Sequence, residues 1–151
     1  INFGDLAKYK KDHPEIFVLA SHPGFGFLES ISMNKLIKNI DLFDGLEHSW
    51  FYAKKVNLNK KVEDVAKKFN KPYIATADAH ILTYFNTDYA VINAEQFDLS
   101  SVLDALRRGR VANITSPKSI FSMISYLVKD IIERMTKYPV KILYYGLFKS
   151  K

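Results

Sequence analysis

The sequence predicts an α/β fold of alternating βα units, with a mostly parallel sheet that is either open or closed into a barrel. Three observations predict it. Short runs rich in β-branched and aromatic residues alternate at least three times with amphipathic helical segments. Proline and glycine separate many of these segments, as expected at the ends of helices and strands. No low-complexity segment and no persuasive internal repeat interrupts the alternation.

The first elements are the end of a helix, a strand and a loop. Residues 1–14 are rich in lysine, and we expect them to include a helix that ends near His13 and Pro14. The apolar run within 15–21 predicts a buried strand. Two glycines and a proline in 22–27 then predict a loop.

A helix and a short strand follow. Ser30 or Ser32 is a suitable N-cap for this helix. Its apolar residues have the spacing of one helical face: Met33, Leu36, Ile37 and Ile40. Residues 43–48 predict a short strand with polar groups at its far end. Together with the first strand, these segments would form one βαβ unit.

The next helix and strand repeat this order. A helix is predicted around 62–69, with acidic residues in its first part and lysines in its last, as the helix dipole favours. Asn70 and Pro72 end this helix, and the run 72–77 predicts the following strand.

The remaining segments predict two strands and two helices. A strand is expected at 89–93, a helix from Leu99 that Gly109 closes, and a short strand at 110–115. Ser116 with Pro117 at the first helical position would then open the last helix. This helix is amphipathic, with one apolar side: Ile120, Ile124, Leu127, Val128, Ile131 and Met135.

The composition excludes several classes of protein. At 151 residues, 48% hydrophobic and 25% charged, the chain is about one globular domain long. Without cysteine it can hold no disulfide, thiolate ligand or cysteine nucleophile, which fits an intracellular, cytoplasmic protein. We expect no transmembrane segment and no signal peptide. A net charge of +6 and a pI near 9.4 allow an anionic partner, although the scattered basic pairs fit a solvated surface equally well.

Residues that can bind a metal ion stand where the predicted strands end. Asp78 and His80 are two positions apart, so in extended geometry both side chains leave from the same face. His22 has the same place after the first strand, and Glu47 lies at the end of the second. Functional residues of parallel α/β folds gather at such C-terminal strand ends. A carboxylate with imidazoles is a ligand set that suits Zn, Mn or Fe.

A simpler interpretation of the same residues exists. Asp78 could cap an ordinary strand-end turn and His80 could be a surface histidine. His22 alone would more often be a loop histidine that is hydrogen-bonded to backbone. The ordered placement of all four residues on one rim of the fold favours the metal site.

The stretches that contain these residues resemble the PHP (polymerase and histidinol phosphatase) family of metal-dependent phosphoesterases, specifically its C-terminal half. The resemblance covers roughly residues 15–115. Each motif alone is weak, and the order of the set makes it more specific. The matching stretches are Leu19 to Gly24 (LASHPG), Phe43 to Glu47 (FDGLE), Pro72 to His80 (PYIATADAH) and Ala105 to Arg110 (ALRRGR).

The resemblance implies a fold and a division of the chain. Residues 1–115 would form the C-terminal half of a distorted (β/α)7 PHP-type barrel. Residues 116–151 would add the C-terminal amphipathic helix and an apolar and basic tail that pack on it.

The resemblance also implies a chemistry, the hydrolysis of a phosphate mono- or diester by metal-activated water at a site of two or three divalent ions. His22, Asp78 and His80 match metal ligands of the family. Glu47 matches a recurrent glutamate that would support a ligand or contact the substrate. The substrate would be a phosphorylated small molecule or a nucleic-acid end.

The chain departs from the family pattern at its beginning. PHP proteins open with a His-x-His motif that supplies further ligands, and the four histidines of this chain form no such motif. Because the chain starts with Ile1, we expect a fragment that is inactive alone. Such a half barrel would leave sheet edges uncovered, so we expect it to bind the N-terminal half of the barrel or to form a homo-oligomer.

Two other functions are compatible with the sequence. A non-catalytic RNA-binding or scaffold protein, similar to a PHP-like protein subunit of ribonuclease P, would fit the basic charge. Asp78 and His80 argue against it, because such a scaffold has no chemical need for them. Residues 117–151 could instead dock a partner or lie on a membrane interface, although packing against the barrel is favoured.

The other histidines and the late arginines have simpler expected roles. His13 is expected in solvent, and His48 alternates away from Glu47, which favours a structural or surface position. Arg107, Arg108 and Arg110 could hold a substrate phosphate, but we favour charges at a helix C-terminus that face water.

Overall fold

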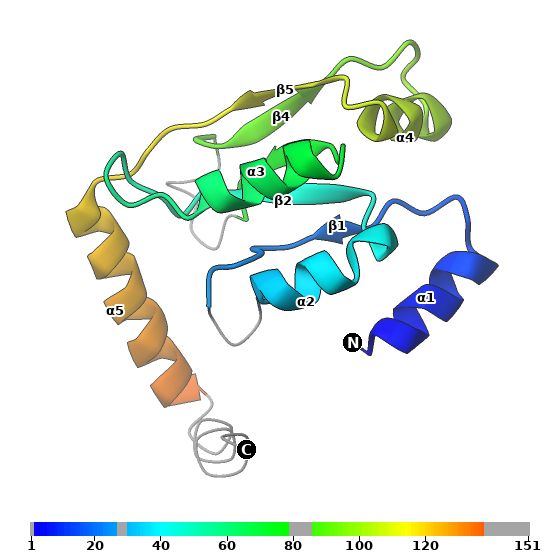
Figure 1. The fold of residues 1–151 in the computed structure, drawn as a ribbon. Helices are drawn as coiled ribbons and strands as arrows, with labels where there is room; N and C mark the ends of the chain where they lie inside the picture. The colour runs from blue at the N-terminus through cyan, green and yellow to red at the C-terminus, as the bar shows by residue number, and fades with distance from the viewer. Residues whose placement is uncertain (1, 27–29, 79–85, 138–151) are drawn as a thin grey trace. The chain divides into compact units, whose positions relative to one another are not determined.

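In the computed structural model, residues 2–26, 30–78 and 86–137 are described, and they form a mixed α/β structure (Figure 1). The chain divides into two compact units, Ile1–Pro117 and Lys118–Lys151. The predicted α/β class is therefore confirmed. The described elements do not make a complete (β/α)7 barrel.

The first unit contains a three-stranded parallel sheet in the order β1-β2-β3. Its strands are β1 (Leu19–Ala20), β2 (Gly45–Ser49) and β3 (Tyr73–Thr76). The register pairs Ala20 with Leu46 and Glu47 with Ile74. Because the strands are parallel, their C-terminal ends lie at the same edge of the sheet. The predicted strand-end residues are thereby brought to one edge.

Helices connect these strands. α1 (Phe3–Asp12) precedes the sheet, α2 (Met33–Lys38) and the 3₁₀ turn η1 (Ile40–Leu42) join β1 to β2, and α3 (Asn59–Lys68) joins β2 to β3. Of the two predicted caps, Ser30 and Ser32, it is Ser32 that caps α2, because its hydroxyl accepts a hydrogen bond from the backbone N–H of Lys35.

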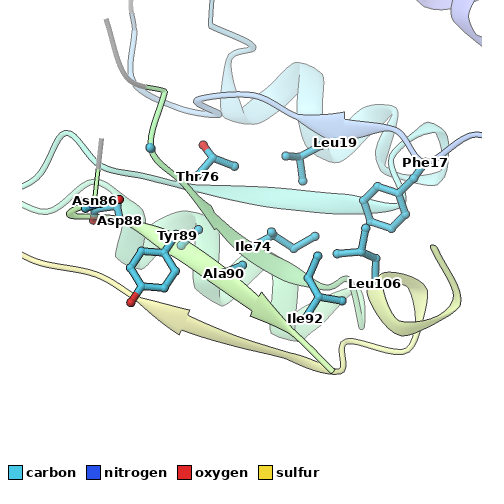
Figure 2. Close-up of a pocket in the computed structure, with 12 residues that line it drawn as sticks. Phe17, Leu19, Ile74, Thr76, Asn86, Asp88, Tyr89, Ala90, Ile92 and Leu106 are labelled. Carbon is cyan, nitrogen blue, oxygen red and sulfur yellow. The ribbon is translucent and has the colours of Figure 1, made fainter. Parts of the chain in front are cut away.

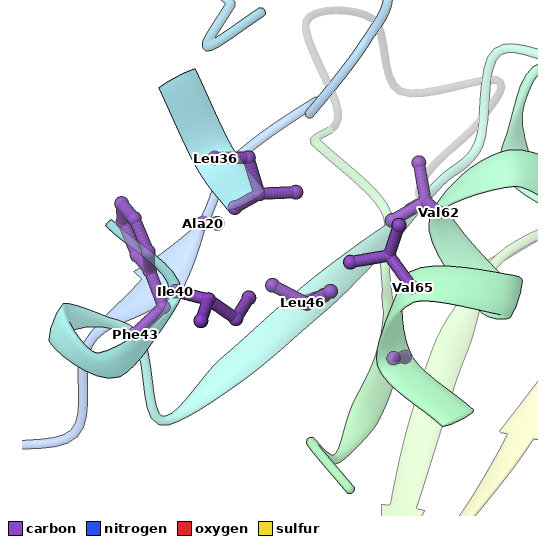
Figure 3. Close-up of a cluster of buried hydrophobic side chains, with 8 residues drawn as sticks. Ala20, Leu36, Ile40, Phe43, Leu46, Val62 and Val65 are labelled. Atoms are coloured by element: carbon purple, nitrogen blue, oxygen red, sulfur yellow. The ribbon is translucent and has the colours of Figure 1, made fainter. Parts of the chain in front are cut away.

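The hydrophobic core places α2 and α3 on the same face of the sheet. Leu46 of β2 is fully buried between side chains of the two helices, as Figure 3 shows. Burial of each such large side chain stabilises the fold by about 1.5–3 kcal/mol. Sequential strand order with the helices on one face occurs in βα barrels and equally in each half of a doubly wound sheet. The cluster comprises Ala20, Leu36, Ile40, Phe43, Leu46, Val62, Val65 and Ala66.

The second sheet corrects the expectation of a mostly parallel arrangement. β4 (Tyr89–Ile92) and β5 (Val111–Ile114) are antiparallel, although α4 (Leu99–Arg107) lies between them in the sequence. Gly109, with φ of +64°, ends α4, and the backbone N–H of Arg110 then bonds the carbonyl of Ala105. The chain therefore reverses directly into β5 instead of crossing over to a parallel position.

Two predicted boundaries were wrong. The strand expected at 15–21 is reduced to β1, and just before it the N–H of Val18 bonds the side chain of Asp44 rather than a backbone carbonyl. α5 (Ile120–Lys137) does not start at Pro117. Its first turn is bonded by Ser119, whose hydroxyl accepts from the N–H of Ser122. No helix in the described part of the chain combines the length and apolar character that a membrane crossing requires.

Candidate functional site

Three of the four predicted site residues meet at the C-terminal edge of the parallel sheet. His22 lies just after β1, Glu47 lies within β2, and Asp78 lies just after β3. His22 Nδ1 is 3.1 Å from Glu47 Oε2, and His22 Nε2 is 3.4 Å from Asp78 Oδ2. The imidazole ring therefore lies between two carboxylates that come from two other segments of the chain.

The fourth predicted residue, His80, lies outside the described residues. Among residues 2–26, 30–78 and 86–137, no group of three or more His, Asp or Glu side chains is arranged so that it could hold a metal ion. Within this part of the chain, the three residues form a row in which His22 contacts both carboxylates.

Glu47 is buried, and its carboxylate accepts the hydrogen bonds that link these residues. It is 2% exposed, and its Oε2 accepts from the backbone N–H of His22 at 2.6 Å as well as facing His22 Nδ1. Its Oε1 accepts from the hydroxyl of Thr76. Burial by itself raises the pKa of Glu47, but the hydrogen bonds from His22 and Thr76 together lower the pKa below its ordinary value. Glu47 is therefore held as a carboxylate.

The backbone is left-handed at His22 and at Asp78. His22 has φ of +44° and Asp78 has φ of +39°. Among non-glycine residues, His, Asp and Asn adopt this region more readily than most, but it still costs free energy. Conformations of this kind are concentrated at functional sites, where the surrounding structure holds them in place. Here both occur at the two residues whose side chains face each other.

His22 and Asp78 are close enough that both could bind one cation. A separation of 3.4 Å between Nε2 and Oδ2 is longer than an ordinary hydrogen bond. Two atoms that each lie about 2.0–2.1 Å from one tetrahedral ion are about 3.4 Å apart. Metal-binding histidines usually donate their other ring N–H to a carboxylate, and Glu47 is in that position at Nδ1 of His22.

Thr76 is a site residue that the sequence analysis missed. Its only signal in the sequence is alternation along β3, which places it on the same face as Ile74, the register partner of Glu47. That signal could be used only once the pairing of β2 with β3 was known.

A pocket of about 500 Å³ lies beside Ile74 and Thr76 of β3 (Figure 2). Ile74 is the register partner of Glu47, so the pocket and Glu47 are on the same face of the sheet. Its walls come from β1, β3, β4 and α4 and are mostly apolar, with Thr76, Asn86 and Asp88 as polar side chains. The apolar lining includes Phe17, Leu19, Ile74, Ala90, Ile92 and Leu106.

His48 has a structural position on the opposite face of β2. It is 9% exposed, and its ring meets the edges or faces of Tyr52 and Tyr73 at centroid distances of 5.0 and 5.5 Å. Burial lowers the pKa of His48, and the negative charge of Asp88 only partly offsets this. Of the two alternatives left for His48, the structural one is therefore confirmed. His13 is about half exposed and faces Glu15 at 3.4 Å.

The three late arginines are engaged in structural contacts. Arg107 donates to the carbonyls of Glu15 and Ile16, which fixes the segment before β1 to the end of α4. Arg108 and Arg110 both bind the carboxylate of Asp104. The expected position at the C-terminal end of a helix is observed, and the three guanidinium groups bond protein acceptors there.

Comparison with known proteins supports part of this picture. Residues 56–111 match the PHP_C family model, described as PHP-associated. This stretch includes Asp78 but neither His22 nor Glu47, and it is less than half of the chain. The resemblance to a C-terminal part of a PHP domain protein is thereby confirmed. No curated protein and no solved structure matches the chain.

Proposed function

We propose that this chain supplies part of the divalent-metal site of a phosphoesterase, which hydrolyses a phosphate mono- or diester. His22, Asp78 and His80 are the proposed ligands, and Glu47 holds His22 in place. The observation that carries the proposal is the approach of His22 Nε2 to Asp78 Oδ2 at 3.4 Å with the buried Glu47 carboxylate behind Nδ1. The match of residues 56–111 to the PHP-associated model supports it.

The residues suit the charge problem of this reaction. A phosphoester is anionic and repels hydroxide, and a bound divalent ion would neutralise phosphate charge and lower the pKa of a bound water. Asp78 contributes a negative charge toward a cation. Glu47, by accepting from Nδ1, directs the lone pair of Nε2 of His22 toward Asp78. The nitrogen and oxygen donors suit Zn, Mn or Fe.

The substrate class that fits best is a phosphorylated small molecule or a nucleic-acid end. Family members complete their site with ligands from the first half of the barrel. We therefore propose that full activity requires such a half, and that this chain alone binds metal without efficient turnover.

Elemental analysis after loading with Zn or Mn tests the proposal. The parent chain should retain metal after desalting, and the double variant Asp78→Ala/His80→Ala should lose it. The double variant Asp12→Ala/His13→Ala is the matched control, because it removes one aspartate and one histidine at the end of α1. Equal metal content in the parent and in the Asp78→Ala/His80→Ala variant would refute the proposed site.

Binding of RNA by a non-catalytic protein is the second candidate function. The observation in its favour is the net charge of +6. It predicts RNA affinity that falls steeply with salt and is unchanged in Asp78→Ala. A filter-binding titration at two salt concentrations distinguishes the candidates, since the phosphoesterase proposal requires Asp78 for its function.

A further inference from the structure

We infer that Thr76 is a positioning residue of the candidate metal site, acting on His22 through Glu47. This inference rests on the proposed function for its consequence, which is tighter metal binding. Its structural basis is a row of contacts from Thr76 to Glu47, from Glu47 to His22, and from His22 toward Asp78.

The two oxygens of Glu47 are divided between two partners. Oε1 accepts from the Thr76 hydroxyl, and Oε2 accepts from the backbone N–H of His22 and faces its Nδ1. A carboxylate with only one oxygen engaged can rotate about its last side-chain bond. With both oxygens engaged, the plane of the carboxylate is fixed, and Oε2 stays opposite Nδ1.

Burial makes the Thr76 contact consequential. Glu47 is 2% exposed, so water cannot readily replace a hydroxyl that is removed. Without Thr76 the Oε1 atom would need a new donor. The contacts of His22 are with Oε2, so loss of the Thr76 bond would leave the carboxylate free to turn and would release Oε2 from its place opposite Nδ1.

β3 connects Thr76 to Asp78, the proposed ligand that faces His22. Thr76 is the last residue of β3, and Asp78 follows two positions later. Thr76 pairs in register with Ser49 of β2, in the same ladder that pairs Glu47 with Ile74. The end of β3 therefore positions both residues of the contact between His22 Nε2 and Asp78 Oδ2. It positions Asp78 directly and His22 through Glu47.

Two substitutions separate the hydroxyl from the shape of Thr76. Thr76→Val keeps the volume and the branching and removes the hydroxyl, whereas Thr76→Ser keeps the hydroxyl. Thr115→Val is the matched control, because it removes a threonine hydroxyl that is bonded to Tyr52 elsewhere in the same unit. Thermal melting of each variant shows whether the fold is retained.

Cobalt titration followed by visible absorption is the first readout. We expect Thr76→Val to bind Co²⁺ more weakly than the parent, by up to about 10-fold, and with altered absorption bands. Thr76→Ser and Thr115→Val should match the parent. Parent-like affinity and bands in a folded Thr76→Val variant would overturn the role of Thr76 while leaving the proposed function intact. Unchanged binding in Asp78→Ala would refute the proposed function instead.

The ¹⁵N NMR signals of the His22 ring give a second readout that needs no metal. They are assigned by their loss in His22→Gln. We expect a protonated Nδ1 in the metal-free parent and in Thr76→Ser, and a shifted Nδ1 signal in Thr76→Val. If the parent binds no cobalt, the proposed function fails, and these signals still decide whether Thr76 positions the ring. Identical ring signals in the parent and in Thr76→Val would overturn the inference.

Discussion

The side-chain amide of Asn59 hydrogen-bonds both backbone groups of Ser49. Its Oδ1 accepts from the N–H of Ser49 at 3.0 Å, and its Nδ2 donates to the carbonyl of Ser49 at 2.8 Å. Both residues are 2% exposed. Asn59, the first residue of α3, thus bonds the backbone groups of Ser49, the last residue of β2, where the parallel ladder ends. These bonds fix the helix to the strand that carries Glu47.

Asn113 makes a similar pair of bonds, to two different residues, at a more exposed place. Its Oδ1 accepts from the N–H of Ala75, and its Nδ2 donates to the carbonyl of Tyr73, each at 2.8 Å. These are backbone groups at the edge of β3. A side-chain amide therefore replaces the peptide of a fourth strand and links β5 to the parallel sheet.

The two asparagines give a test of what burial adds to similar bonds. Asn59→Ala should lower the free energy of unfolding by about 3 kcal/mol, because two buried backbone groups lose their partners. Asn113→Ala should cost less, about 1–2 kcal/mol, since water can reach the carbonyl of Tyr73, although Ala75 is only 3% exposed. Urea unfolding measures both, with the exposed Asn93→Ala as a control that should change little. Equal costs for Asn59→Ala and Asn113→Ala would contradict the role assigned to burial.

His48 should make the fold sensitive to mild acid. Burial holds the folded-state pKa of His48 below that of the unfolded chain, which is about 6.5. Its contribution to stability is therefore fully present above that pH. This stabilising contribution is lost as the pH falls below about 6.5, because the unfolded chain then binds a proton that the folded chain does not.

The variant His48→Phe isolates this effect. It keeps an aromatic ring between Tyr52 and Tyr73 and removes the titrating group and the buried Nδ1, which has no hydrogen-bond partner among the described residues. We expect the loss of unfolding free energy between pH 7.5 and pH 5.5 to be smaller in His48→Phe than in the parent. An equal loss in the two proteins would show that His48 does not titrate differently on folding.

Gly24 should be required for the loop that carries His22. It has φ of +78°, and an added Cβ would lie 2.7 Å from Sδ of Met33. Gly26 has a similar φ of +74°, but a Cβ added there would meet nothing within 4 Å. Gly26→Ala should cost about 1–2 kcal/mol for the left-handed backbone alone, and Gly24→Ala should cost more.

Met33→Ala provides the background that checks the cause. In that background, Gly24→Ala should cost no more than Gly26→Ala, because the contact with Sδ is gone. Thermal or urea unfolding of the four variants measures this. If Gly24→Ala lowers the free energy of unfolding as much in the Met33→Ala background as in the parent, the strain has a cause other than the contact with Met33.

Glu47→Gln should separate folding from metal binding. The glutamine oxygen can still accept from His22, and its NH₂ group can donate to the hydroxyl of Thr76, so all partners stay bonded. We expect the free energy of unfolding to change by less than about 1 kcal/mol. Metal affinity should fall about tenfold or more, because a neutral amide makes the His22 ring a weaker ligand. Calorimetric titration with Zn²⁺ measures it, and an unchanged affinity would exclude Glu47 from the site.

The sequence by itself determined the local structure and the class of the fold. The spacing of apolar residues predicted α2, α3 and α4, and Ser32 was identified as a cap, because helix formation and capping depend on residues within a few positions of one another. The same local order placed His22, Glu47 and Asp78 at strand ends, from which their approach at one edge of a parallel sheet followed.

Only the tertiary structure decided the role of each of these residues. Glu47 takes its partners from the loop after β1 and from the end of β3, 25 and 29 positions away in the chain. The reversal of β5, the short β1 and the buried position of His48 likewise depend on contacts between distant segments. Patterns in a sequence report the preferences of neighbouring residues, whereas hydrogen bonds and burial are settled by which distant segments come together. Thr76 therefore looked like an ordinary strand residue until β2 and β3 were paired.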